Sequence, residues 1–176
     1  MATYHIRVEE LASYTPKLNV NDKVYLSGTV YTARDAAHKR FAALLDEGKE
    51  LPFPLKGAVI YYAGPTPTPE GLPIGSCGPT TSGRMDVFAP RLLDLGLIAM
   101  VGKGERSEEV KQAVCRNQAV YFCAIGGAGA LACQCITDCQ VIAFEDLGCE
   151  SVKRLTFKEF PLVVANDSHG GDIFSR

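Results

Sequence analysis

The sequence predicts an α/β fold with a mainly parallel core sheet, to which both ends of the chain add further β structure. One observation is a repeated order: three times, an apolar strand-like run is followed by a glycine-rich loop and then by a helical pattern. This order is typical of parallel strands joined by right-handed crossovers, with helices covering the sheet. The other observation is size and composition: 176 residues, 47% of them hydrophobic, suit a single domain over residues 1–176 and exclude intrinsic disorder.

The N-terminal part of the chain predicts two strands and one helix. Charged and apolar residues alternate over Tyr4–Val8, and β-branched and aromatic residues fill Lys23–Tyr31. A helix follows, for which Thr32 can cap the start and Gly48 the end. Its apolar stripe, at helical spacing, consists of Ala37, Phe41, Leu44 and Leu45.

The middle of the chain contains the repeated units. Two strands, Gly57–Ala63 and Leu97–Val101, enclose a helix that we expect to run from the loop at Gly78–Gly83 to Gly96. Within that helix Pro90 predicts a kink, because proline lacks the backbone N–H of one helical hydrogen bond.

The second half of the chain continues this order. Ser107 can cap the next helix, and two glutamates in its first turn suit the positive helix end. Ala119–Ile125 is the third predicted strand, and a short helix after it reaches Cys135. Gln140–Phe144 is expected as a fourth strand, and the tail adds β structure in two pieces. These pieces are Val152–Phe157 and Phe160–Ala165.

Charge and cysteine content exclude several classes of function. Lys and Arg number 18 and Asp and Glu 20, so the chain lacks the net basic face that nucleic-acid binding needs. Seven cysteines, an odd number, in a chain without an apolar export signal indicate reduced thiols and a cytoplasmic location. Asn117–Thr137 has no charged residue, but glycines interrupt it where a membrane helix would be continuous. We therefore expect neither a nucleic-acid nor a membrane partner.

A loop dense in glycine and hydroxyl side chains, Gly75–Asp86, is a candidate anion site. Glycines let backbone N–H groups approach a ligand, and Arg84 can bind a carboxylate through two parallel hydrogen bonds. The loop departs from a phosphate-binding P-loop, because Arg84 and Met85 stand where that motif has Lys and Ser or Thr. The alternative is a capped turn with a surface arginine.

Two other glycine-rich loops also lie at strand ends, where open parallel sheets bind ligands, and a helix start provides a fourth candidate element. Lys103, between two glycines, is either a charge clamp or a solvated side chain. Gly127–Ala132 fits the dinucleotide fingerprint G-x-G-x-x-A, although it follows the third strand and that fingerprint belongs after the first. Arg34 and His38 share one helix face near its positive end, so they either bind an anion or are solvated.

The cysteine spacing does not predict a metal site. Cys133, Cys135 and Cys139 have neither the paired spacing of zinc ligands nor the spacing of a ferredoxin cluster. We expect them to be small buried apolar residues, and we assign no metal ligand to this chain.

Five segments together resemble the C-terminal, or β-subunit, part of class I iron–sulfur fumarate hydratases and L-tartrate dehydratases. The resemblance covers about Lys23 to Phe174 in the same order, and its most specific motif is GPTTSGRMD. It implies a swivelling β/β/α domain. The segments are Gly28–His38, Tyr61–Pro65, Gly78–Asp86, Gly102–Glu105 and Ile125–Ala128.

The resemblance also implies a partner. In this family a larger subunit or domain supplies three cysteine ligands to a [4Fe–4S] cluster, whose open iron binds the substrate. This chain would then be the β subunit of a hetero-oligomer that is inactive without its α subunit. The implied reaction is the reversible hydration of fumarate to (S)-malate, with L-tartrate dehydration as the alternative. An alternative of another class is a stand-alone nucleotide- or anion-binding module.

Individual residues acquire roles from the same resemblance. Arg34, Arg84 and Lys103 would hold the two carboxylates of a dicarboxylate substrate. Thr80 resembles the residue proposed to exchange the proton beside a carboxylate, and His38 matches a histidine suggested to act in catalysis in the tartrate enzymes. Thr81, Ser82 and Gly83 would line the same anion loop.

Overall fold

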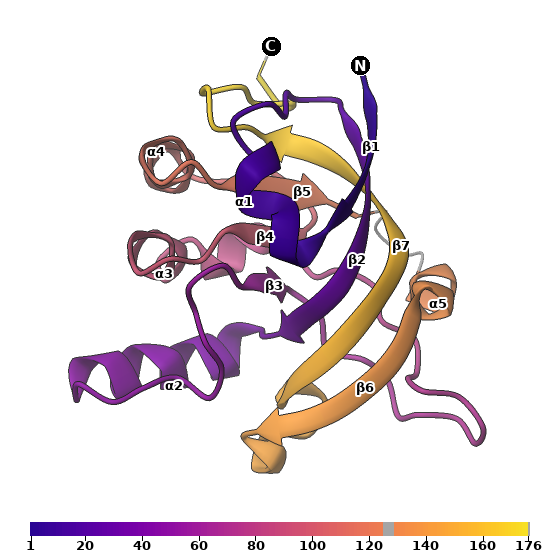
Figure 1. Cartoon of the computed structure of the whole chain (residues 1–176). Coiled ribbons are helices and arrows are strands. Elements are labelled where there is room, and N and C mark those ends of the chain that lie inside the picture. Colours follow the sequence, from indigo (N-terminus) through magenta and orange to yellow (C-terminus); the bar gives the residue numbers. More distant parts are fainter. Residues whose placement is uncertain (125–128, 176) are drawn as a thin grey trace.

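The computed structural model describes residues 1–124 and 129–175, and Figure 1 shows its mixed α/β architecture. The strands are β1 (Thr3–Arg7), β2 (Lys23–Thr32), β3 (Val59–Tyr61), β4 (Ala99–Gly102), β5 (Val120–Cys123), β6 (Ile136–Ala143) and β7 (Val152–Asn166). The α-helices are α1 (Leu11–Tyr14), α2 (Asp35–Asp46), α3 (Ala89–Asp94), α4 (Glu108–Arg116) and α5 (Gly129–Ala132). Short 3₁₀ turns are η1 (Val8–Glu10), η2 (Ser82–Met85), η3 (Cys133–Cys135) and η4 (Glu145–Glu150).

Strands β1 to β5 pair in sequence order and are all parallel, which confirms the mainly parallel core. The tail forms one long strand, β7, rather than two pieces. It runs antiparallel to β5, β6 and β2. Because β7 pairs with both β5 and β2, the strands β2, β3, β4, β5 and β7 close into a ring.

The predicted fourth strand forms as β6, but it does not extend the parallel series. Strand β6 covers Gln140–Phe144 up to Ala143, but it pairs only with β7 among the described strands, and it is antiparallel. The reason is that β7 already occupies the edge of β5 that a further parallel strand would need, through the pair Phe122 with Val164.

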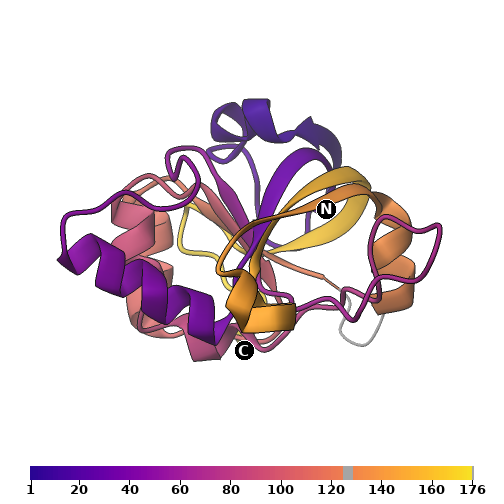
Figure 2. The ribbon, with the colours of Figure 1, turned by 90° about the horizontal axis from the view of Figure 1, so that it is seen from below.

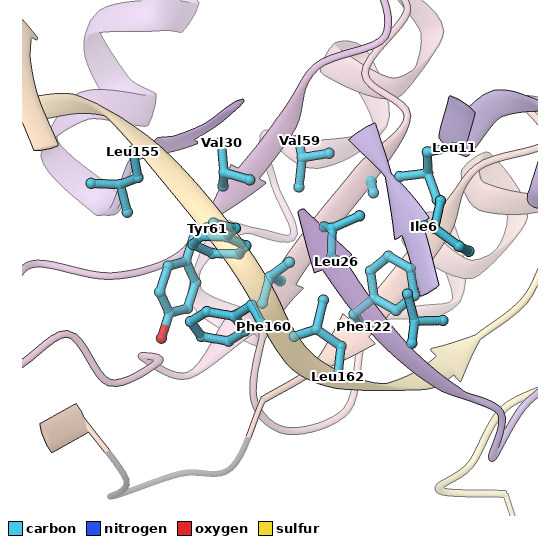
Figure 3. Close-up of a cluster of buried hydrophobic side chains, with 14 of the residues drawn as sticks. Ile6, Leu11, Leu26, Val30, Val59, Tyr61, Phe122, Leu155, Phe160 and Leu162 are labelled. Carbon is cyan, nitrogen blue, oxygen red and sulfur yellow. The ribbon is translucent and has the colours of Figure 1, made fainter. Parts of the chain in front are cut away.

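Each ring strand presents its two faces to different cores. Side chains on one face of all five ring strands form the inner core, part of which Figure 3 shows. The opposite face packs against α2, α3 and α4 and forms the outer core. These three helices lie together on one side of the strands, whereas α5 lies on the other side (Figures 1 and 2). Residues of the inner core include Leu26, Val30, Tyr61, Phe122 and Leu162, and residues of the outer core include Phe41, Ile60, Tyr62, Met100 and Val114.

Two predicted helix boundaries require correction. Thr32 does not cap α2; it ends β2, and its buried hydroxyl accepts a hydrogen bond from the Lys153 backbone N–H at 3.0 Å. Pro90 does not kink a long helix, because the chain forms the turn η2 first and α3 begins only at Ala89. Pro90 therefore lies in the first turn of a helix, where its missing N–H leaves no hydrogen bond broken.

The cap predicted for α4 is confirmed, since the Ser107 hydroxyl accepts from the Val110 N–H at 3.3 Å. Within the described ranges, no helix combines the length and apolar character that crossing a membrane requires.

Candidate active site

Two loops predicted to carry the site run side by side at the carboxyl ends of β3 and β4. The Thr80 N–H donates to the carbonyl oxygen of Tyr62, directly after β3, at 2.7 Å. Thr81 then forms a parallel bridge with Lys103, and the Ser82 N–H donates to the Lys103 carbonyl at 2.9 Å. The anion loop is thus fixed against the residue that follows β4, and Thr81 and Lys103 are neighbours.

The close approach of these loops depends on a glycine. A Cβ added to Gly102 would overlap the Ser82 Oγ and lie 2.9 Å from Cδ2 of Tyr62. Real Cβ atoms essentially never approach a neighbour so closely. Only glycine therefore lets the anion loop pack on the end of β4.

The Ser82 hydroxyl lies inside the protein, 2.7 Å from the Tyr121 hydroxyl. The Tyr121 hydroxyl also lies 2.7 Å from the Gly104 carbonyl oxygen, which can only accept a hydrogen bond. Because a phenol has one proton, Tyr121 donates to Gly104 and Ser82 donates to Tyr121. Ser82 is fully buried, so its hydroxyl and its N–H are both engaged within the chain and shape the anion loop from beneath.

Behind the two loops lies Arg106, which no sequence motif indicated. Its guanidinium carbon lies 5.2 Å from the ring centroid of Tyr62 and 4.7 Å from that of Tyr121. Its Nη2 donates to the Tyr62 hydroxyl at 3.2 Å, and its Nε donates to Asp86 at 2.7 Å. The available signal was an arginine directly before the helix cap Ser107, where a solvated cation would face the positive helix end.

Arg34 lies at the start of α2, where it is the N-terminal cap residue with an extended backbone. Its side chain packs over Gly64, just beyond β3, because a Cβ on that glycine would lie 3.0 Å from Arg34 Nη1. The Arg34 Nε is buried and has no hydrogen-bond partner among the described residues. A buried donor of this kind needs an acceptor, so Arg34 is suited to binding an anion.

The start of α2 is joined to the anion loop by an ion pair. Arg84 Nη2 lies 2.9 Å from Asp35 Oδ2, and the two side chains are 52% and 28% exposed. Arg84, one of the three cations expected to bind substrate, is therefore half-exposed. Asp35, which follows Arg34 in the chain, holds it near Arg34.

His38 lies one turn farther along α2, in a different environment. Its ring packs against the rings of Phe41, Tyr62 and Phe88 and is 1% exposed. Nδ1 lies 2.8 Å from the Arg34 carbonyl oxygen, so Nδ1 carries the proton and donates, and Nε2 has no partner among the described residues. Burial lowers the pKa of His38 to about 4, which makes the ring neutral at pH 7.

The predicted site residues divide into a group that lies together at the strand ends and a group that supports it. In the first group the anion loop lies against Lys103, and Asp35 pairs with Arg84 next to Arg34. The second group consists of His38 and Ser82. His38 contacts this assembly through the backbone of Arg34, and Ser82 supports it from within. The members of the first group are Thr80, Thr81, Gly83, Arg84 and Lys103.

Neither a metal site nor a dinucleotide site is formed by the described residues. They contain no cluster of three or more His, Cys, Asp or Glu side chains that would hold a metal ion. All of Ile125–Ala128, and with it the first two residues of the Gly127–Ala132 fingerprint, lies outside the described residues. The strand after that fingerprint, β6, does not pair with β5, so the parallel crossover of a dinucleotide fold is not formed.

Comparison with known proteins gives these features a context. The family model described as the fumarase C-terminus matches residues 2–176. The chain is 38% identical over 171 residues to the anaerobic class I fumarate hydratase of Escherichia coli (strain K12), and 39% identical over 169 residues to fumarate hydratase 1, mitochondrial, of Leishmania major. These matches cover 96% and 95% of this chain but only 31% of each relative.

A shorter relative matches along most of its own length. The chain is 38% identical over 166 residues to a protein of Methanocaldococcus jannaschii named "Putative L(+)-tartrate dehydratase subunit beta", covering 91% of this chain and 85% of that protein. The chain therefore belongs to the fumarase C-terminus family, and it corresponds to the small C-terminal or β-subunit domain of these hydro-lyases.

Proposed function

We propose that this chain is the β subunit of a two-subunit class I fumarate hydratase, a cytoplasmic heteromer that reversibly hydrates fumarate to (S)-malate. The swivelling β/β/α arrangement that the family resemblance implies, as one domain over residues 1–176, is part of the same proposal. The main support for this proposal is the arrangement of the cationic residues. Thr81 of the anion loop is bridged to Lys103, and Asp35, next to Arg34, pairs with Arg84.

The proposed role of the three cations is to bind a dicarboxylate. Fumarate is a small dianion, so the positive charges of Arg34, Arg84 and Lys103 suit it. Removal of a proton from the carbon beside a carboxylate builds negative charge on that carboxylate. The same cations would stabilise this charge more strongly in the transition state than in bound malate, which is how they would accelerate the reaction.

Thr80 is the proposed proton-transfer residue. Its backbone is fixed by the bond from its N–H to Tyr62, and the side chain stands on the loop that also carries Arg84. A threonine hydroxyl is a weak base in water, and nearby cations favour its alkoxide form only where water is excluded. We therefore expect Thr80 to act only once a partner covers the loop. His38 ranks below Thr80 because its ring is enclosed by aromatic side chains.

The [4Fe–4S] cluster of this proposal belongs to the partner. When bound there, it supplies a Lewis acid for the substrate hydroxyl and carboxylate. In this proposal the contribution of this chain is to bind and orient the substrate and to exchange a proton.

Reconstitution tests the proposal. The chain alone, the larger hydratase subunit of the same organism alone and the purified mixture are each assayed without oxygen for interconversion of fumarate and (S)-malate. We expect conversion only by the mixture. A stable, cluster-loaded complex that converts neither fumarate nor tartrate would contradict a hydro-lyase role.

L-tartrate dehydration is a second candidate, because the relative named as a tartrate dehydratase β subunit is matched over 85% of its length. The two candidates differ in substrate hydroxyls rather than in carboxylates, so the cation set serves both. A panel of fumarate, (S)-malate and L-tartrate on the reconstituted complex separates them through the ratio of kcat/KM values.

A further inference from the structure

A pocket of about 500 Å³ opens beside Lys103, and no residue of the anion loop (Gly75–Asp86) lines it. Its floor crosses three adjacent strands, because Val163 of β7 pairs with Lys23 of β2 on one side and with Cys123 of β5 on the other. Its walls come from the end of β4 and from the C-terminal segment. The remaining lining residues are Tyr25, Gly104, Ala124, Pro161, Leu162, Ile173 and Phe174.

The chemistry of this pocket is apolar with two cations. Lys23 is exposed and Lys103 is half-buried, and no carboxylate of the described residues forms an ion pair with either ammonium group. Unpaired lysines beside an apolar pocket favour an occupant with apolar side chains flanked by carboxylates, since charges across interfaces are complementary. A ligand that is entirely apolar would leave both cations without counter-charge.

The pocket also lies where the missing part of the relatives would join. The family model is that of a C-terminus and matches from residue 2, so the rest of a fused relative would enter at the position of Ala2. In this chain the Lys23 N–H donates to the Ala2 carbonyl at 2.8 Å, and Thr3 pairs with Lys23. The N-terminus therefore lies at the rim of the pocket, and both termini lie at the same end of the molecule (Figure 1).

We propose that this pocket, defined by Lys23, Val163, Cys123, Lys103 and Phe174, receives a segment of the cluster-bearing subunit in which acidic side chains flank apolar ones. The identity of that partner rests on the proposed function. Lys103 lines the pocket and is bridged to Thr81 of the anion loop. Docking here would therefore bring the partner against the anion loop and help to exclude water from Thr80 and Arg84.

Two variants test the docking surface, each with a matched control. Lys23→Glu reverses a charge at the rim, and its control Lys158→Glu reverses an exposed lysine on β7 that does not line the pocket. Val163→Asp places a carboxylate in the floor, and its control Val141→Asp changes a 45% exposed valine on β6. Affinity for the purified larger hydratase subunit is measured by titration calorimetry, and folding of each variant is checked by thermal melting.

We expect Lys23→Glu and Val163→Asp each to weaken association with the larger subunit at least about tenfold. The controls should leave the affinity within about twofold, because a substitution affects binding only where the partner contacts the changed residue. Lys23→Glu keeps the test valid if Val163→Asp fails to fold. Unchanged affinity of folded Lys23→Glu would overturn the proposal, as would self-association of the chain through this face in sedimentation experiments. Wild-type association without hydratase or dehydratase activity would instead contradict the proposed function and leave the docking surface standing.

Discussion

Asp86 and Arg106 form a buried ion pair that joins the anion loop to the start of α4. Arg106 Nε lies 2.7 Å from Asp86 Oδ1, and the two side chains are 0% and 15% exposed. The second carboxylate oxygen accepts from the Ser107 N–H at 2.7 Å. Since Arg106 also contacts Tyr62 and Tyr121, one side chain supports the backbone that holds Thr80 and the hydroxyl that holds Ser82.

Replacing Arg106 by Met should therefore destabilise the fold and the site together. It leaves the Asp86 carboxylate largely buried without its cation, and breaking a buried pair in this way costs about 3 kcal/mol or more. Urea unfolding of the full chain measures the loss. Arg116→Met is the control, because Arg116 forms a surface pair with Asp94 whose side chains are 50% and 47% exposed; it should cost less than about 1 kcal/mol. Equal losses in the two variants would refute the supporting role of Arg106.

Gly102→Ala should destabilise the packing of the anion loop on the end of β4. The new methyl would meet Ser82 and Tyr62 in a packed interior, and overfilling of this kind costs roughly 1–3 kcal/mol. Gly83→Ala, in the anion loop that packs on Gly102, is the control, because its Cβ would find only the Glu105 carbonyl oxygen at 3.8 Å. Thermal melting should show a clear loss for the first and a change within about 0.5 kcal/mol for the second. A tolerated Gly102→Ala would mean that the loops do not pack as closely as described.

His38 should make stability depend on pH in mildly acidic solution. Burial lowers its pKa from 6.5 to about 4 in the folded chain, so between these values the unfolded state binds the proton more tightly. The free energy of unfolding is therefore not reduced by His38 above pH 6.5. It falls as the pH drops from 6.5 toward 4, by up to about 1.4 kcal/mol per pH unit. His38→Gln removes the titrating group while keeping a donor for the Arg34 carbonyl.

Urea unfolding at several pH values compares wild type with His38→Gln. The variant should lose less stability on acidification, whereas His169→Gln, at an exposed position, should behave like wild type. Identical pH dependence of wild type and His38→Gln would show that the ring is not buried in its neutral form.

Arg84→Ala should reduce catalysis by the assembled enzyme. If Arg84 binds a substrate carboxylate away from water, its removal costs several kcal/mol of transition-state binding, or about a hundredfold in kcat/KM. The matched control is Arg91→Ala, since Arg91 also pairs with an aspartate on α2, at 2.7 Å, but on the exposed outer surface. Kinetics on complexes with equal cluster content are the measurement, and a normal kcat/KM for Arg84→Ala would remove this residue from the site.

Local patterns in the sequence predicted most of the elements near the site. The Ser107 cap, the strand pattern of Lys23–Tyr31 and the glycine-rich loop before Arg84 each depend on residues close together in the chain. Such patterns can be read from the sequence without knowledge of distant segments. The same local information placed the anion loop and Lys103 at neighbouring strand ends, because consecutive parallel strands end at one edge.

Features that depend on distant contacts were beyond such patterns. The closure of the ring depends on the pairing of β7 with β2, more than a hundred positions away. The pairing of β7 with β5 then excludes β6 from the parallel series. Pro90 was misplaced because the apolar spacing around it continues across a turn. Arg106 was missed because its role comes from Asp86 and two tyrosines on other elements.

We propose above all that Arg34, Arg84 and Lys103 of this chain hold a dicarboxylate in a site that the partner subunit completes. The most direct measurement is a crystal structure of the assembled complex with (S)-malate bound. We expect both carboxylates within hydrogen-bonding distance of these three cations, with Thr80 facing the carbon that exchanges its proton. Carboxylates bound entirely by the partner, with Arg34 and Arg84 turned to solvent, would contradict it.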